Sequence, residues 1–367
     1  MTKRFTVLVL PDIQNNTISQ GGKKSLERWC LLRMSITESR LYAKEKQKIR
    51  CRVCSHACLL REGQKGLCGT REVTEGELRS LNYGDVVALA TDPIEKKPLY
   101  HFYPGSEILS LGTWGCNFRC GFCQNWSLAQ ENSFRRGEYY TPEKVLQLLQ
   151  TTSPESVGIA YTYNEPAVWF EFLYHTARKL HEHGFANILV TNGYFSEEAL
   201  EELAPYLDAL NVDVKAFHHE FYRSYCGARL DPVLKTVEKC VGRFHLEVTY
   251  LVIPGLNDST EEVSRMVEWL AGLDPEIPLH FSRYVPGYRF NLPPTPVETL
   301  ENLRELALEK LSYVYLGNVP GHTAANTYCP SCGTLLMQRR NSQVVVQNLK
   351  SYRCTSCGRE IAFTGMR

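Results

Sequence analysis

The chain has 367 residues, and its 41 Lys and Arg residues nearly balance its 40 Asp and Glu residues, for a formal net charge of +1 at pH 7. This length allows two or three domains of about 150 residues, or one large barrel with appendages. The balanced charge gives no indication of a nucleic-acid partner, and no apolar run reaches the roughly 18 to 20 residues of a membrane helix. We therefore expect a cytoplasmic protein without a membrane or nucleic-acid partner.

Residues 1–106 are predicted to form an extension in front of the main domain. Charged residues are dense over 44–50, which predicts a solvent-facing helix. Turn signals at Asp92-Pro93 and at Pro104-Gly105 indicate that residues 78–106 are a connecting segment.

Strand-like and helix-like segments alternate from residue 107 onward. The predicted strands are Ile108–Gly112, Ser156–Tyr163, Ala186–Asn192, Asp208–Ala216, His245–Ile253, Leu279–Tyr284 and, as a possible seventh, Tyr313–Asn318. The predicted helices include Glu165–His183, Ser196–Tyr206, Ser259–Leu273 and Pro296–Leu311. Such repeated units require parallel strands with right-handed crossovers. Residues 107–322 are therefore predicted to form a partial (β/α)6-type barrel; the alternative, a doubly wound sheet, is disfavoured because Gly-x-Gly-x-x-Gly is missing.

Polar residues occupy one face of several predicted strands. Asn211, Asp213 and Lys215 alternate with apolar residues on the fourth strand, Glu247 lies on the fifth and His280 on the sixth. Period two places these side chains in the barrel interior, where buried charges need partners. We expect Asn211, Asp213, Lys215 and His280 to contact a cofactor; the alternative is that such residues pair with one another at the base of the barrel.

Eleven of the 14 cysteines fall into three tight groups. The groups are Cys51, Cys54, Cys58 and Cys68; Cys116, Cys120 and Cys123; and Cys329, Cys332, Cys354 and Cys357. Disulfides do not persist in a reducing cytosol, so these groups predict metal or cluster sites.

The central group follows the first predicted barrel strand, at the rim where barrels of this kind build active sites. Its three thiolates are one fewer than a saturated iron–sulfur cubane or a structural zinc requires. A cubane held by three cysteines leaves one iron open to another ligand. The alternatives are a zinc or redox loop, or three buried thiols without a function.

The Cys-x3-Cys-x-aromatic-Cys motif at Cys116, Cys120 and Cys123 resembles that of the radical S-adenosylmethionine (SAM) superfamily. The resemblance implies a [4Fe-4S] cluster whose open iron binds SAM, and a low-potential electron donor of the flavodoxin or ferredoxin type. It also implies reductive cleavage of SAM to a 5′-deoxyadenosyl radical that abstracts hydrogen from a substrate. The cofactor contacts that it implies are Phe122, Asn164, Glu165, Asn192, Asp213 and Lys215.

Over residues 107–290 the chain is similar to pyruvate formate-lyase activating enzymes, although Gln124 and Val190 depart from their pattern. It resembles the AmmeMemoRadiSam group more closely, through residues 92–101, 225–229 and 317–322. That resemblance implies Memo-like and AMMECR-like partners and leaves the substrate open. Alternative functions are a glycyl-radical-enzyme activase, an RNA-modifying enzyme and a non-enzymatic metal-binding scaffold.

The two outer cysteine groups each supply four thiolates. Cys329, Cys332, Cys354 and Cys357 form two Cys-x-x-Cys-Gly knuckles, so residues 323–367 are predicted to be a zinc ribbon. The spacing of Cys51, Cys54, Cys58 and Cys68 suits either zinc or a second iron–sulfur cluster.

Overall fold

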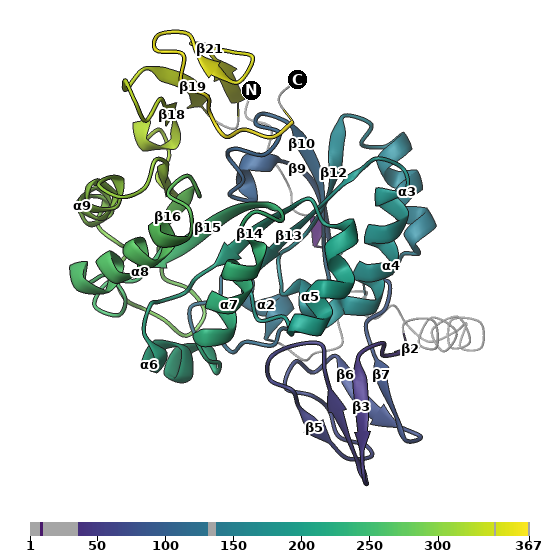
Figure 1. Ribbon diagram of the computed structural model, residues 1–367. Helices are drawn as coiled ribbons and strands as arrows, with labels where there is room; N and C mark the ends of the chain where they lie inside the picture. Colours follow the sequence, from purple (N-terminus) through teal and green to yellow (C-terminus); the bar gives the residue numbers. More distant parts are fainter. Residues whose placement is uncertain (1–7, 10–35, 131–136, 341–342, 366–367) are drawn as a thin grey trace, which may run out of the picture.

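A computed structural model describes residues 8–9, 36–130, 137–340 and 343–365 of the chain (Figure 1). Within these residues, a nine-stranded sheet has the order β1-β9-β10-β12-β13-β14-β15-β16-β17. Its strands are β1 (Leu8–Val9), β9 (Ala88–Pro93), β10 (Glu107–Gly112), β12 (Ser156–Tyr161), β13 (Ala186–Thr191), β14 (Ala209–Asp213), β15 (His245–Val252), β16 (Leu279–Arg283) and β17 (Val314–Gly317). Neighbours from β10 to β17 are parallel, whereas β9 pairs antiparallel with β10 and β1 with β9.

Helices connect the parallel strands and cover the outer side of the sheet (Figure 1). They are α2 (Trp126–Ala129), α3 (Pro142–Thr151), η2 (Pro166–Trp169), α4 (Phe170–His181), α5 (Glu197–Leu203), α6 (His219–Phe221), α7 (Asp231–Cys240), α8 (Thr260–Leu273) and α9 (Val297–Leu308). Side-chain caps define several helix starts, because the oxygens of Thr141, Ser196 and Ser259 accept hydrogen bonds from first-turn N–H groups. The predicted α/β class with a mostly parallel sheet is confirmed.

The charged segment 44–50 is a hairpin, so the predicted helix is wrong. Strand β3 (Tyr42–Glu45) pairs antiparallel with β4 (Lys48–Cys51), and Lys46 adopts a φ of 54° in the turn. Ile49 and Cys51 are buried while the intervening residues are partly exposed, which is strand periodicity. The many lysines concealed this alternation.

The segment 78–106 is more than a connection, because it contributes β9 to the main sheet. Asp92 and Pro93 end this strand and precede η1 (Ile94–Lys96), so the turn predicted between them is wrong. Pro93 lies opposite Glu107 of β10, whereas β1 pairs with β9 only at residues 88 and 89. A proline without a ladder N–H is tolerated at such a free edge.

Smaller sheets flank the main sheet at opposite ends (Figure 1). The N-terminal ones contain β2 (Thr37–Glu38), β5 (Leu59–Leu60), β6 (Arg71–Thr74) and β7 (Glu77–Ser80) together with β3 and β4. The C-terminal ones contain β18 (Thr327–Tyr328), β19 (Leu335–Arg340), β20 (Gln343–Val346), β21 (Leu349–Lys350) and β22 (Arg353–Cys354). β8 (Asp85–Val86) and β11 (Glu138–Tyr139) form a separate pair. Across the described ranges, none of the helices has the length and apolar character that a membrane crossing requires.

Candidate active site

A cavity opens where the parallel strands end, and the three central cysteines line it. Its empty volume is about 940 Å³, including space open to solvent. The predicted residues in its lining are Cys116, Cys120, Cys123, Phe122, Asn164, Glu165, Asn192, Asp213 and Lys215. The fold therefore brings the predicted residues of the loop after β10 together with those at the ends of β12, β13 and β14.

The cysteine loop is held by backbone and side-chain hydrogen bonds. Arg119 N donates to Cys226 O at 2.8 Å, and the Arg119 guanidinium donates to Cys116 O at 2.7 Å. Burial raises the pKa of Cys116 and raises that of Cys123 to about 11. Without a cation these thiols keep their protons, and a bound metal would displace those protons.

Cys226 lies behind the triplet. It is fully buried, and its neighbouring thiol together with burial raises the pKa of Cys120 well above its usual value. Cys226 does not line the cavity, and no described cysteine besides the triplet does so. The open face of the triplet thus lacks a fourth thiol, as the binding of a non-protein ligand there requires.

Glu165 is a buried carboxylate that follows the end of β12. It accepts hydrogen bonds from Thr191 Oγ1 at 2.7 Å, Asn192 N at 2.8 Å and Ala167 N at 3.1 Å. Burial raises its pKa to about 7 although these hydrogen bonds oppose the shift. A cationic group in the cavity would favour the ionised form.

Tyr163 and Asn164 hold the turn before Glu165. Tyr163 has a φ of 70°, which is rare outside glycine, and its hydroxyl donates to Asp92 at 3.0 Å. Asn164 accepts from Thr113 N at 3.1 Å and donates to Gly115 O at 2.8 Å, joining this turn to the cysteine loop. Sequence reasoning did not find the strained backbone of Tyr163, because no local signal distinguishes this tyrosine from one in ordinary conformation.

An ion pair and an aromatic ring complete the lining. Lys215 Nζ lies 2.7 Å from Asp213 Oδ2, and although burial opposes it, Asp213 raises the pKa of the lysine above its ordinary value. Phe122 packs against Phe221 and Phe290, with ring centroids 5.6 and 5.5 Å away. The cavity therefore offers a carboxylate, an ion pair and an apolar wall.

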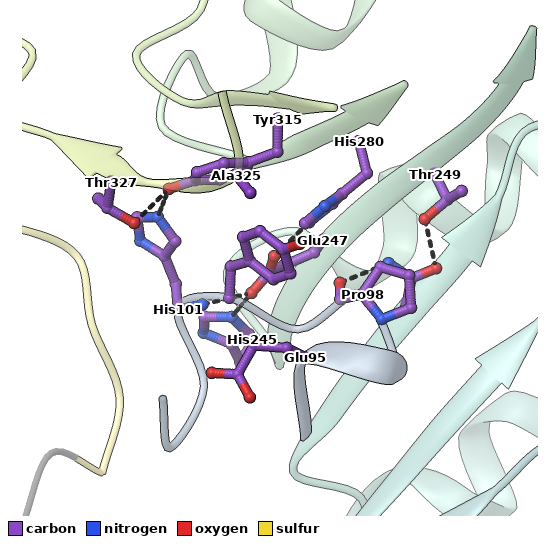
Figure 2. A network of polar contacts seen from close by, with 12 residues as sticks. Glu95, Pro98, His101, His245, Glu247, Thr249, His280, Tyr315, Ala325 and Thr327 are labelled. Atoms are coloured by element: carbon purple, nitrogen blue, oxygen red, sulfur yellow. Dashed lines mark hydrogen bonds and ion pairs between the residues drawn. The ribbon is translucent and has the colours of Figure 1, made fainter. Parts of the chain in front are cut away.

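Asn211 and His280 are not in the cavity lining. His280 Nε2 bonds Glu247 Oε2 at 2.6 Å, and Glu247 Oε1 is bonded by His245 Nε2 at 3.0 Å and by His101 N at 2.7 Å (Figure 2). Although burial opposes it, these histidines lower the pKa of Glu247 well below its usual range.

Asn211 belongs to the same polar interior. It donates to Pro98 O at 2.8 Å and accepts from Thr249 Oγ1 at 2.9 Å. This is the paired arrangement that the sequence offered as the alternative, and a cofactor role for Asn211 and His280 stays a prediction.

The C-terminal cysteines form a compact metal-binding group. All four sulfurs lie within 4.8 Å of one another, with Cys329 Sγ 3.5 Å from Cys357 Sγ and Cys332 Sγ 3.7 Å from Cys354 Sγ. Cys51, Cys54, Cys58 and Cys68 line a second, smaller cavity beside the cysteine loop.

Comparison with known proteins defines the class. The model of the radical SAM superfamily matches residues 112–270. An uncharacterized protein of Methanocaldococcus jannaschii is 43% identical over 337 residues, covering 88% of this chain and 98% of that protein. The chain belongs to the radical SAM superfamily and is an enzyme of that class.

Two further relatives are named as activating enzymes. A protein of M. jannaschii named as a glycyl-radical enzyme activating enzyme is 25% identical over 222 residues, covering 58% of this chain and 80% of that protein. The 4-hydroxyphenylacetate decarboxylase activating enzyme of Clostridioides difficile is 24% identical over 163 residues, covering 41% of this chain and 51% of that enzyme.

Proposed function

We propose that Cys116, Cys120 and Cys123 hold a [4Fe-4S] cluster and that SAM binds at its open iron. The observation that carries this proposal is the cavity lined by three thiols, two of them buried and that of Cys123 partly exposed, with no fourth described thiol on its open face. When bound, the reduced cluster supplies the electron that cleaves SAM to methionine and a 5′-deoxyadenosyl radical, which abstracts hydrogen from a substrate.

The polar residues of the cavity would bind and orient the cofactor. Glu165, once ionised, presents a buried carboxylate to the ammonium group of SAM, and Asn164 positions the turn that carries it. Lys215 and Asp213 form a pair that can offer a cation and a carboxylate to a zwitterionic amino acid. The ring of Phe122 offers an apolar surface to adenine.

Anaerobic reconstitution with iron and sulfide, then dithionite and SAM, tests the proposal. We expect 5′-deoxyadenosine from the wild type and from a Cys240→Ala control, which removes a buried thiol on α7 outside the cavity. Cys120→Ala should form none. Equal product from Cys120→Ala and wild type would contradict the proposal.

For the substrate, we propose a small metabolite that is handled together with Memo-like and AMMECR-like proteins. The motif resemblance at residues 92–101, 225–229 and 317–322 supports this assignment. Part of the first motif serves the site, because Asp92 accepts hydrogen bonds from Lys97 at 2.8 Å and from Tyr163 at 3.0 Å. Gel filtration of the three purified proteins tests the partnership, and independent elution in every pairing would contradict it.

The similarity to activating enzymes supports a second candidate, the activation of a glycyl-radical enzyme. It predicts a glycyl-radical EPR signal when the reduced protein, SAM and a glycyl-radical enzyme from the same organism are mixed. Formation of 5′-deoxyadenosine without that signal would favour the metabolite.

We further propose that Cys329, Cys332, Cys354 and Cys357 bind zinc in a ribbon. The sulfur separations of 3.5 and 3.7 Å are close to the edge of about 3.8 Å expected for tetrahedral zinc with Zn–S bonds of about 2.3 Å. Hydrogen bonding with Thr334 also lowers the pKa of Cys332 to about 6, which favours a thiolate. The zinc content of purified protein tests this proposal.

A further inference from the structure

The N-terminal cysteines surround a cavity of their own. Its empty volume is about 360 Å³, including space open to solvent, and all four cysteines are in its lining. Cys51 ends β4 and donates its N–H to Cys58 O at 2.9 Å, while Cys54 forms an isolated bridge with Phe195 of the main domain. The end of β4 and the segments that follow it thus bring four cysteines to the lining of one cavity.

The N-terminal cysteines differ from the C-terminal ones in how closely their sulfur atoms are grouped. Within the described residues, the C-terminal cysteines are the group whose sulfurs all lie within 4.8 Å of one another, close enough for one ion. The N-terminal cysteines and the central triplet are described as well, and neither forms such a one-ion group. Thiolates that hold a cubane must stand farther apart than those that hold one ion, because four irons and four sulfides lie between them.

A buried donor lacks a partner at the wall of this cavity. Asn117 lines the cavity and is 2% exposed, and within the described chain its Nδ2 has no hydrogen-bond partner. Its Oδ1 is used, because it accepts from Asn192 Nδ2 at 2.8 Å. An N–H donor left free at a buried site suits the sulfur atoms of a cluster, which accept hydrogen bonds.

A cation also faces the cavity. Arg71 is 1% exposed and lines the space, and its guanidinium donates to Glu171 at 2.9 and 2.8 Å. A buried guanidinium at the cavity wall offers positive charge to thiolate ligands.

The N-terminal cavity adjoins the central cysteine loop. His56 Nε2 lies 2.8 Å from Asn117 O, and the Arg119 guanidinium bonds Leu67 O. Gly115 has a φ of 85°, and a Cβ there would lie 2.8 Å from Cys68 O. The segment around Cys68 and the loop around Cys116 are thus in direct contact.

We propose that Cys51, Cys54, Cys58 and Cys68 hold a second [4Fe-4S] cluster beside the loop of Cys116. Four thiolates saturate this cubane and leave no iron open to SAM. The role available to it is electron transfer: a one-electron reductant of the flavodoxin or ferredoxin class reduces the second cluster, which returns to its oxidised state by reducing the first. No bond forms or breaks at the second cluster in this step. The N-terminal ligand set stands whether or not SAM is cleaved at the first site.

The full chain, reconstituted anaerobically, tests the proposal by its iron, acid-labile sulfide and zinc contents. Two cubanes predict about eight irons and eight sulfides per chain in the wild type and in the Cys240→Ala control. A variant with Cys116, Cys120 and Cys123 changed to Ala should keep about four of each, with an EPR signal in the reduced state that SAM does not alter. Adding Cys51→Ala and Cys68→Ala to that variant should abolish both iron and signal.

A variant that changes only the N-terminal cysteines serves as the control for misfolding. Cys51→Ala with Cys68→Ala alone should keep about four irons and a reduced cluster whose EPR signal responds to SAM, which shows an intact main domain. The proposal is overturned if the triple central variant binds about two zinc ions and no sulfide, because the N-terminal site would then hold one ion. Full iron in the N-terminal variant would overturn it as well. A wild type with two clusters and no SAM response would refute the proposed function and leave the second cluster standing.

Discussion

Glu165→Gln should change the stability of the cluster-free protein in a way that depends on pH. The buried carboxyl has its pKa raised from 4.5 to about 7. Its contribution to stability is therefore fully present below pH 4.5 and is lost as the pH rises through 7. Linkage gives a loss of roughly 1 kcal/mol at pH 5 and roughly 3 kcal/mol at pH 8.

Glutamine does not ionise, so the variant avoids this loss of stability, but the substitution introduces a different one. Its amide N–H₂ would replace the oxygen that accepts from Asn192 N, which leaves a buried donor unsatisfied at a cost of about 1–3 kcal/mol at either pH. The variant should therefore be less stable than or comparable to the wild type at pH 5. Between pH 5 and pH 8 the variant should gain roughly 2 to 3 kcal/mol of stability relative to the wild type.

Urea unfolding of both proteins at pH 5 and pH 8 measures this difference, and other titrating groups cancel in the comparison. With the cluster bound, the same variant should bind SAM more weakly at pH 8, by about 30-fold or more, because a charge-assisted hydrogen bond is lost. An equal stability difference at the two pH values would refute the burial argument for Glu165.

Three further variants test other parts of the structure. Cys226→Ala should keep the iron that Cys120→Ala loses, and redox titration should give a lower cluster potential because a polar thiol beside a ligand sulfur is gone; iron loss would contradict this. Glu171→Gln breaks the buried pair with Arg71 and should cost about 3–5 kcal/mol in urea unfolding, and a cost below about 1 kcal/mol would be inconsistent with an uncompensated charge. Cys329→Ser should release about one zinc per chain without changing the iron content, and metal analysis showing unchanged zinc would refute the ribbon site.

The alternating strands and the cysteine loop were predictable because their signals are local. Buried parallel strands are short apolar runs, and β10, β12 and β13 show this pattern in the sequence itself. The spacing of Cys116, Cys120 and Cys123 is equally local. The hairpin at 42–51 was missed because lysines fill its partly exposed positions, although Ile49 and Cys51 carry the strand period.

Long-range pairing could not be predicted in the same way. The two-residue alternation of a strand places the side chains of Asp213 and His280 on the inner face of the sheet. It does not show which end of a strand reaches the cavity. Asp213 ends β14 and lines the cavity, whereas His280 is near the start of β16 and pairs with Glu247. The contact between His56 and Asn117 joins segments 61 residues apart, and no local pattern encodes it.

The most direct test of the central claim is the EPR spectrum of the reduced, reconstituted protein with and without SAM. Binding of SAM at an open iron predicts a change in the signal of the cluster at Cys116, Cys120 and Cys123. Cys123→Ala should lose that response, while Cys240→Ala should keep it. A wild-type cluster whose spectrum is the same with and without SAM would contradict the account.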